Sequence, residues 1–331
     1  MLALLAIATP TACRRADVPV MLRLGYFANV THAPAIVMLD RGFLAEELGP
    51  GVTLQTRTFN AGPDAVEALF SNALDITYVG PNPAINAFAR SHGEAIRIIA
   101  GAASGGAALV VQPSITSPAQ LRGTTLASPQ LGNTQDVALR AWLAGQHLVT
   151  TREGGGDVHI MPQANAQTLE TFRAGRIQGA WVPEPWASRL VIEGGGHVLV
   201  DERTLWPDSQ FVTTQVVVRT AFLREHPDVV TRCLRAHVRA IAFLNDDPVA
   251  ARALVNAAIG RLTGKTLSDT VITRAWSALR FTVDPIAASL RKSARDAAAA
   301  GLLDSVNLDG IYDLGALNQI LARAGQRAIT P

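Results

Sequence analysis

The 331-residue sequence has very few lysines and cysteines, and these absences exclude several kinds of protein. Lys265 and Lys292 are its only lysines, so arginine carries nearly all of the positive charge. The formal net charge is +2 and no basic cluster is present, so we do not expect nucleic acid as a partner. Charged residues make up 17% and hydrophobic residues 48%, which is typical of a folded globular protein.

The two cysteines, Cys13 and Cys233, lack a second thiol at metal-ligand spacing. Cys233 precedes His237 by one helical turn and could share a metal with it, but we favour a buried structural cysteine. No G-x-G-x-x-G leads from a strand into a helix, and no phosphate-binding loop keeps its leading glycine. We therefore expect no metal and no cofactor.

Long hydrophobic runs are also missing, because no stretch reaches the roughly 18 apolar residues that a membrane span needs. The N-terminus, MLALLAIATPTACRR, resembles the end of a bacterial lipoprotein signal peptide. It departs from that pattern at Pro10, where leucine is usual, and no basic residue precedes the apolar run. We expect residues 1–21 to be a signal or lipid-anchor segment and linker, with Cys13 acylated. A frayed hydrophobic terminus is the alternative.

From residue 22, strand-like and helix-like segments alternate. Strands are expected at 22–27, 52–59, 75–80 and 95–101, with helices at 33–48 (broken near Gly42), 63–72 and 83–91. After a segment rich in small residues, the strands TTLAS, DVHIM, QGAWV and HVLVD alternate with helices at 134–145, 165–174 and 186–192. This order predicts an α/β fold with mostly parallel sheets flanked by helices.

The two series of elements predict two lobes with a ligand cleft between them. We expect lobe I at 22–110, lobe II at 111–215, and a return to lobe I with C-terminal helices at 216–331. Crossings near 107–113 and 211–218 would form a hinge.

The loops at the carboxyl ends of the predicted strands, where α/β proteins bind ligands, contain no lysine or arginine. They are rich in Gly, Asn, Gln, Thr and Pro, and lie at 28–34, 60–64, 79–84, 103–107, 128–136, 162–167 and 182–186. This composition fits an anion held by backbone N–H groups at helix starts and by amide and hydroxyl side chains. At any single loop, ordinary helix capping explains the same residues.

The sequence offers little support for an enzyme. His32 could act as a general base, but no partnered carboxylate is evident, so a cap or a ligand contact is favoured. Glu184 stands between Pro183 and Pro185 in AWVPEPWASRL, a stiff elbow that suits a general acid, a ligand contact or a helix start. No second carboxylate is evident that could pair with Glu184 in acid–base chemistry.

From about Leu22 to about Ala300 the chain resembles the substrate-binding proteins of bacterial ABC importers in the nitrate/sulfonate/taurine group, of the aliphatic-sulfonate-binding type. Four segments carry the resemblance in family order: RLGYFANVTHAPAIV, GPDAVEALFSNALDITYVGPNPAINAF, LRGTTLASPQLGNTQDVALRAWL and AGRIQGAWVPEPWASRLV. It implies a two-lobe periplasmic-binding-protein type II architecture.

The resemblance also implies the ligand contacts, which are Asn29, His32, Gly62, Gly80, Asn82, Gly106, Asn133, Thr134 and Glu184. Glu184 would repel a sulfonate, so we expect it to meet an amine or another donor on the ligand, or to accept bonds from the loops.

The implied function is a receptor that captures taurine or an alkanesulfonate for an ABC permease and its ATPase subunits. Nitrate, bicarbonate and a thiamine-precursor pyrimidine are alternative ligands, and an enzyme on the same fold is the alternative class. We expect a monomer in the periplasm or on the outer face of the cytoplasmic membrane.

Overall fold

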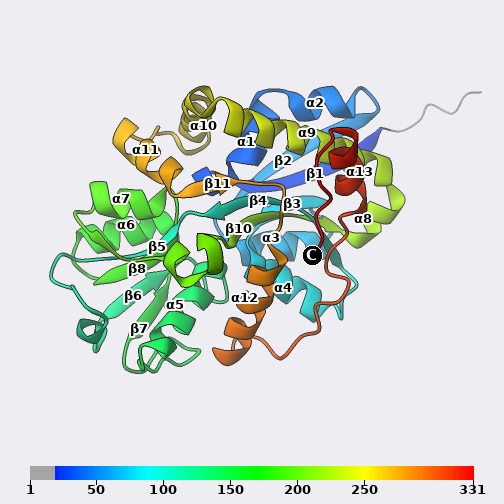
Figure 1. Cartoon of the computed structure of the whole chain (residues 1–331). Helices are drawn as coiled ribbons and strands as arrows, with labels where there is room; N and C mark the ends of the chain where they lie inside the picture. The colour runs from blue at the N-terminus through cyan, green and yellow to red at the C-terminus, as the bar shows by residue number, and fades with distance from the viewer. Residues whose placement is uncertain (1–18) are drawn as a thin grey trace, which may run out of the picture.

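The computed structural model describes residues 19–331, and the chain folds into two sheets with flanking helices (Figure 1). Cys13 and most of the expected signal and linker segment lie outside the described residues. We call each sheet with its helices a lobe: lobe I contains the six-stranded sheet and lobe II the five-stranded sheet. This arrangement confirms the predicted α/β fold class.

The sheet of lobe I combines strands from both ends of the chain. Its order is β11 (Leu279–Phe281), β4 (Ile96–Gly105), β10 (Val212–Arg219), β3 (Ile76–Val79), β1 (Val20–Phe27) and β2 (Val52–Phe59). β1 pairs in parallel with β2 and β3, whereas β10 is antiparallel to both β3 and β4. The register of β1 and β2 ends with Phe27 opposite Phe59, so the loops after them leave the same edge.

The sheet of lobe II repeats this plan with fewer strands. Its order is β7 (His159–Pro162), β6 (Thr125–Ser128), β8 (Gly179–Pro183), β5 (Ala107–Val111) and β9 (His197–Asp201). β6 is parallel to β7 and β8, and β5 is antiparallel to β8 and β9. In each sheet, therefore, the strand that follows the crossing from the other lobe is antiparallel to both of its neighbours. The alternation of strand-like and helix-like segments in the sequence does not reveal that β5 and β10 have this orientation.

Helices cover both faces of each sheet. Lobe I carries α1 (Ala33–Asp40), α2 (Phe43–Leu48), α9 (Pro227–Asp246), α10 (Pro248–Thr263), α11 (Asp269–Ser277) and α13 (Gly315–Arg323) over one hydrophobic core, and α3 (Gly62–Phe70), α4 (Pro81–Arg90) and α12 (Ala287–Ala299) over another. The short α8 (Thr220–Glu225) links β10 to α9. In lobe II, α5 (Thr134–Gly145) packs on one face, and α6 (Asn165–Arg173) and α7 (Trp186–Ile192) pack on the other.

The chain passes between the sheets at Gly106 and again between β9 and β10. Gly106 has φ +71°, which favours glycine, and a Cβ there would collide with Leu279. The predicted boundaries at 110 and 215 fall inside β5 and β10, so each crossing lies a few residues earlier than the sequence suggests. The run GAASGGAALVV hides this first crossing because small residues give no clear strand pattern.

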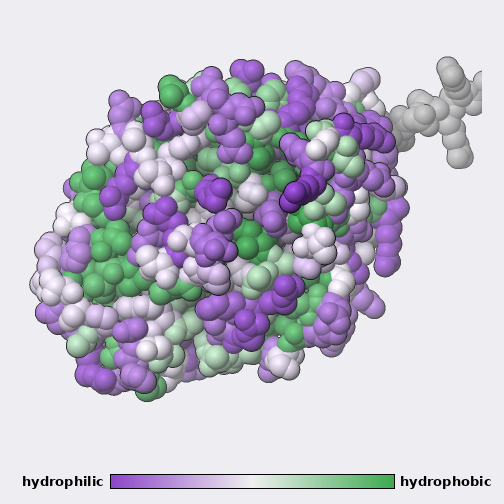
Figure 2. All heavy atoms as spheres, viewed as in Figure 1, coloured by the Kyte–Doolittle hydropathy of each residue, from purple (hydrophilic) through white to green (hydrophobic). Residues whose placement is uncertain are grey.

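Within residues 19–331, the structure contains no helix that is both long and apolar enough to cross a membrane. On the face that Figure 2 shows, hydrophilic and hydrophobic residues are interspersed.

Candidate functional site

The loops that follow several parallel strands meet in a small cavity between the lobes. β1 and β3 lead into it from lobe I, and β6, β7 and β8 lead into it from lobe II. This inner cavity has a volume of about 20 Å³, room for roughly one water-sized group. It is lined by Phe27, Asn29, Thr31, His32, Asn60, Gly80, Asn133, Thr134, Gln135, Asn165, Pro183, Thr213 and Thr214.

Three helices begin at the inner cavity. Gly80 is the N-cap of α4, Asn133 is the N-cap of α5, and α6 starts at Asn165. The Asn133 side chain accepts the N–H of Thr134 at 2.9 Å, which fixes the start of α5. The first turn of a helix leaves N–H groups without intrahelical partners and carries partial positive charge. The starts of α5 and α6 in lobe II therefore favour an anion at this point. The start of α4 contributes less, because Pro81 and Pro83 have no N–H group to offer.

Three buried polar atoms around the inner cavity have no hydrogen-bond partner within the described part of the chain. They are Thr134 Oγ1 and Asn165 Oδ1 from lobe II, and Thr214 Oγ1 from lobe I. Each of these residues is at most 8% exposed. Buried polar groups in native proteins are nearly always paired, so an unpaired cluster around one cavity indicates a ligand-binding position.

His32 contributes a neutral donor. Its ring stacks on Phe27 with centroids 4.2 Å apart, and the N–H of Phe27 donates to His32 Nδ1 at 3.3 Å. Burial lowers the pKa of His32 to about 3, so the imidazole is neutral at physiological pH. Because Nδ1 accepts, the ring proton resides on Nε2, which is left to donate.

Charge is absent from the lining, because the described residues around the inner cavity include no Asp, Glu, Lys or Arg, and His32 is neutral. An anion here would be held by hydroxyl, amide and imidazole donors and by helix starts. This composition agrees with the absence of lysine and arginine from the loops in the sequence.

Five of the residues implied by the family resemblance line the inner cavity: Asn29, His32, Gly80, Asn133 and Thr134. Gly62 lies just behind them, where a Cβ would collide with Pro83 and press on Asn133 Oδ1.

The other three implied residues do not line this cavity; they are Asn82, Gly106 and Glu184. Asn82 is buried, and its Nδ2 donates to the carbonyl of Ser293 at 3.1 Å, which anchors α4 to α12. Gly106 forms the crossing between the lobes and packs against Leu279. Each of them thus has a structural partner.

Glu184 also has partners of its own. Its two carboxylate oxygens accept the N–H and the hydroxyl of Ser188, both at 3.0 Å, at the start of α7. It is 4% exposed, and burial raises its pKa to about 7. The helix-start interpretation of the Pro-Glu-Pro elbow therefore describes the geometry better than a ligand contact does.

Several lining residues are not among the ligand contacts that the sequence predicts. Asn60 and Asn165 lie in two of the loops rich in amide and hydroxyl residues, but no motif distinguishes them from ordinary loop residues. Thr213 and Thr214 lie in β10, where two threonines precede a buried apolar run. Two polar residues in an otherwise apolar strand are the feature of the sequence that could have indicated Thr213 and Thr214.

Cys233 and His237 do not form a metal site. Tyr78 Oη lies 2.8 Å from His237 Nδ1, and His237 Nε2 lies 2.8 Å from the carbonyl oxygen of Gly101. Both ring nitrogens are thus occupied inside the core of lobe I, and Cys233 is a buried free thiol there.

Comparison with known proteins gives a consistent family. A model described as the NMT1-like family matches residues 16–259. The taurine-binding periplasmic protein of Escherichia coli is 27% identical over 198 residues, which cover 59% of this chain and 58% of that protein, less than two thirds of its length. A putative binding protein of Brucella abortus is 24% identical over 242 residues, 72% of this chain and 71% of its own.

Solved structures share the fold. The alkanesulfonate-binding protein of Xanthomonas axonopodis, bound to MOPS, superposes with a TM-score of 0.72 at 20% identity, covering 87% of this chain and 96% of that one. The periplasmic nitrate-binding protein of Synechocystis gives a TM-score of 0.78 at 14% identity, covering 93% and 90%. The architecture is therefore that of periplasmic binding proteins.

Proposed function

Since the chain belongs to the NMT1-like family, we propose that it is the solute-binding receptor of an ABC importer and captures a small organosulfonate between its lobes. The observation that carries this proposal is the pair of unpartnered buried hydroxyl groups on Thr134 and Thr214, which can each donate to an anion. They come from both lobes, so one small ligand would bond to both and hold them together.

A compact anionic head fits the inner cavity best. The uncharged lining suits a group that accepts several hydrogen bonds. The small volume favours a head of few heavy atoms, which the lobes would admit by moving slightly apart. A sulfonate has three such oxygens and stays ionised at any physiological pH. The name of the taurine-binding relative supports this choice.

Nitrate or bicarbonate is the second candidate. The same small volume suits these ions, and the nitrate-binding protein of Synechocystis shares the fold. A pyrimidine ring is larger, so we rank it below both.

We favour a receptor over an enzyme because the only titratable lining residue that we find within residues 19–331 is His32, whose low pKa makes it a weak base. As partners we propose an ABC permease with its ATPase subunits, and as location the periplasm or the outer face of the cytoplasmic membrane. The taurine-binding and nitrate-binding proteins described above are periplasmic, which supports an envelope location. Acylation of Cys13 and a monomeric state remain predictions.

A thermal-shift series tests the proposal. The purified chain is heated with 1-propanesulfonate, taurine, nitrate, bicarbonate or an aminopyrimidine, each with a product assay. We expect a sulfonate at a hundred times its dissociation constant to stabilise the protein by about 2.7 kcal/mol. Stabilisation by nitrate or bicarbonate alone would favour the second candidate, and turnover of any compound would contradict a receptor role.

A further inference from the structure

A second, larger cavity adjoins the first at the outer edge of the interlobe cleft. This cavity, which we call the mouth, has a volume of about 670 Å³ and shares Asn60 with the inner cavity. Nε1 of Trp186, in the mouth, donates to Oδ1 of Asn29, in the inner cavity, at 3.1 Å. The two cavities are therefore neighbouring compartments of one interlobe site.

Cations from both lobes face the mouth. Arg173 and Arg189 reach it from lobe II, and Lys265 reaches it from lobe I. Glu193 is the one carboxylate that we find in the described lining, and it pairs with Arg189 at 3.0 Å. The lining thus has more positive than negative charge, in contrast to the uncharged inner cavity.

The cations differ in how well they are compensated. Arg189 pairs with Glu193 and its guanidinium lies 4.6 Å from the centre of the Trp186 ring. Nη1 of Arg173 lies 3.9 Å from Oε1 of Glu170, and this ion pair is weak because both side chains are exposed to solvent. Lys265 has no ion-pair partner in the part of the chain from 19 to 331, so its charge is the least satisfied.

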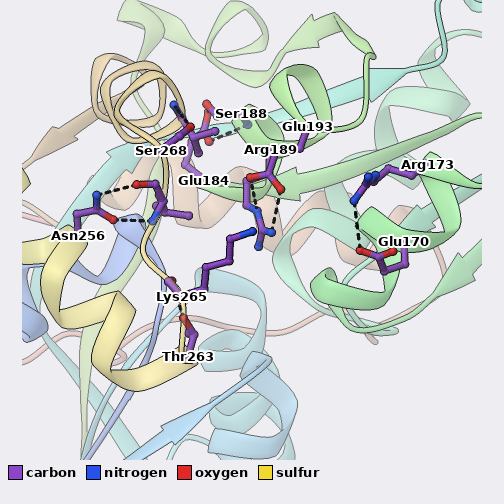
Figure 3. Close-up of polar contacts among 12 residues, drawn as sticks. Glu170, Arg173, Glu184, Ser188, Arg189, Glu193, Asn256, Thr263, Lys265 and Ser268 are labelled. Carbon is purple, nitrogen blue, oxygen red and sulfur yellow. Dashed lines mark hydrogen bonds and ion pairs between the residues drawn. The ribbon is translucent and has the colours of Figure 1, made fainter.

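The loop that carries Lys265 is held in place (Figure 3). Asn256 on α10 donates to the carbonyl of Leu267 at 2.9 Å and accepts the N–H of Leu267 at 2.8 Å. Thr263 Oγ1 donates to the carbonyl of Lys265 at 3.1 Å. In Figure 3 the Lys265 side chain extends from this loop toward Arg189 and Glu193 on the other lobe. A fixed loop therefore presents a flexible cation to the mouth.

Like charges that approach from two lobes repel each other, and an anion between them removes the repulsion. Resting on the proposed function, we propose that the mouth is a second anion subsite. It takes the distal anionic group of a ligand whose sulfonate lies in the inner cavity, and Lys265 is the residue that selects it. The preferred ligand is then an alkanesulfonate with a carboxylate or similar anion at its far end.

This assignment makes the distal group decisive. 3-Sulfopropanoate, 1-propanesulfonate and taurine share a sulfonate and a short spacer, and end in a carboxylate, a methyl group and an ammonium, respectively. The positive charge of the mouth attracts the carboxylate of 3-sulfopropanoate, has little effect on the methyl group of 1-propanesulfonate, and repels the ammonium group of taurine. We expect affinity to fall in that order, and salt to weaken the binding of 3-sulfopropanoate most.

Calorimetric titration of these three probes against the wild type, Lys265→Gln and Arg327→Gln tests the subsite. Arg327 is exposed near the C-terminus, so the second variant controls for net charge. An ω-sulfoalkanoate with a longer spacer is included, because Lys265 can be out of reach of the shortest probe. Lys265→Gln should weaken the sulfoalkanoate that reaches it by about threefold to tenfold and should strengthen taurine, with 1-propanesulfonate unchanged.

The possible outcomes separate the two proposals. If all probes bind but Lys265→Gln changes their affinities equally or not at all, the proposal of a subsite in the mouth is wrong and the receptor proposal stands. If the wild type binds none of the sulfonates, the proposed sulfonate function fails and the subsite with it. A selective effect that Arg327→Gln reproduces would also overturn the role of Lys265.

Discussion

Glu202 illustrates the cost of burying a carboxyl group in lobe II. It is 1% exposed, and one of its oxygens accepts Nε1–H of Trp181 at 2.7 Å. Burial raises its pKa to about 7, despite the opposing influence of that hydrogen bond and of Lys292. Because its unfolded pKa is lower, near 4.5, the folded protein binds more protons than the unfolded chain between these values. Its contribution to stability is therefore present below pH 4.5 and is lost as the pH rises through about 7.

Glu202→Gln should remove this pH dependence. Glutamine can still accept from Trp181 but does not ionise, so the variant should gain about 1–3 kcal/mol relative to the wild type between pH 4.5 and pH 8. Urea unfolding of both proteins across this range gives the difference, in which the other titrating groups cancel. A constant difference at every pH would show that Glu202 does not titrate there.

At the scale of elements, the start of α7 depends on Glu184, whose carboxylate accepts two bonds from Ser188. Glu184→Gln should keep an acceptor for the Ser188 N–H and leave the affinities for taurine and 1-propanesulfonate equal to those of the wild type. Glu184→Ala should lower the free energy of unfolding by about 1–3 kcal/mol, because it leaves a buried N–H unpaired. Titration calorimetry and urea unfolding measure the two effects. A tenfold loss for taurine alone in Glu184→Gln would instead place the carboxylate on the ligand, as the sequence suggests.

Most elements of regular structure could be predicted from the sequence. β2, α5 and α7 have the bounds that the periodicity predicts, because turn residues such as Gly51 and Asn133 mark their ends. β5 and β11 were missed. β5 (AALVV) follows directly on a run of glycine, alanine and serine, which hides where the strand begins. β11 spans only three residues after a helix, which is too short for a pattern of its own.

The candidate site was predictable only in part. Residues at helix starts, such as Asn133 and Thr134, were identified because capping and ligand binding favour the same residue types. Thr214 was missed because its role depends on how β10 is inserted between β3 and β4, a long-range pairing. Lys265 is distant in sequence from every predicted loop, so only the packing of α11 against α7 of lobe II reveals it.

At the scale of the whole molecule, the lobes meet closely at Gly80. A Cβ at this position would collide with Thr134 Oγ1 of the other lobe, although the backbone conformation of Gly80 suits any residue. Gly80→Ala should therefore keep the fold but prevent full closure, with about a fivefold to hundredfold loss of affinity for 1-propanesulfonate.

Small-angle scattering tests the closure directly. The radius of gyration of the wild type should decrease when 1-propanesulfonate saturates it, and that of Gly80→Ala should decrease less. Gly51→Ala is the matched control, since a Cβ there meets no neighbouring atom. Equal compaction in all three proteins would contradict a closure limited by contact at Gly80.

We propose that a ligand anion completes the hydrogen bonding of the buried hydroxyl groups of Thr134 and Thr214, one from each lobe. The most direct test is calorimetric titration of 1-propanesulfonate into the wild type and the Thr134→Val/Thr214→Val double variant, with Thr231→Val as a surface control. Valine keeps the shape and removes unpaired hydroxyls, so the variant should be at least as stable as the wild type. It should bind about a hundredfold or more weakly, because two hydrogen bonds to a charged group are lost. An affinity within about twofold of the wild type would contradict the account.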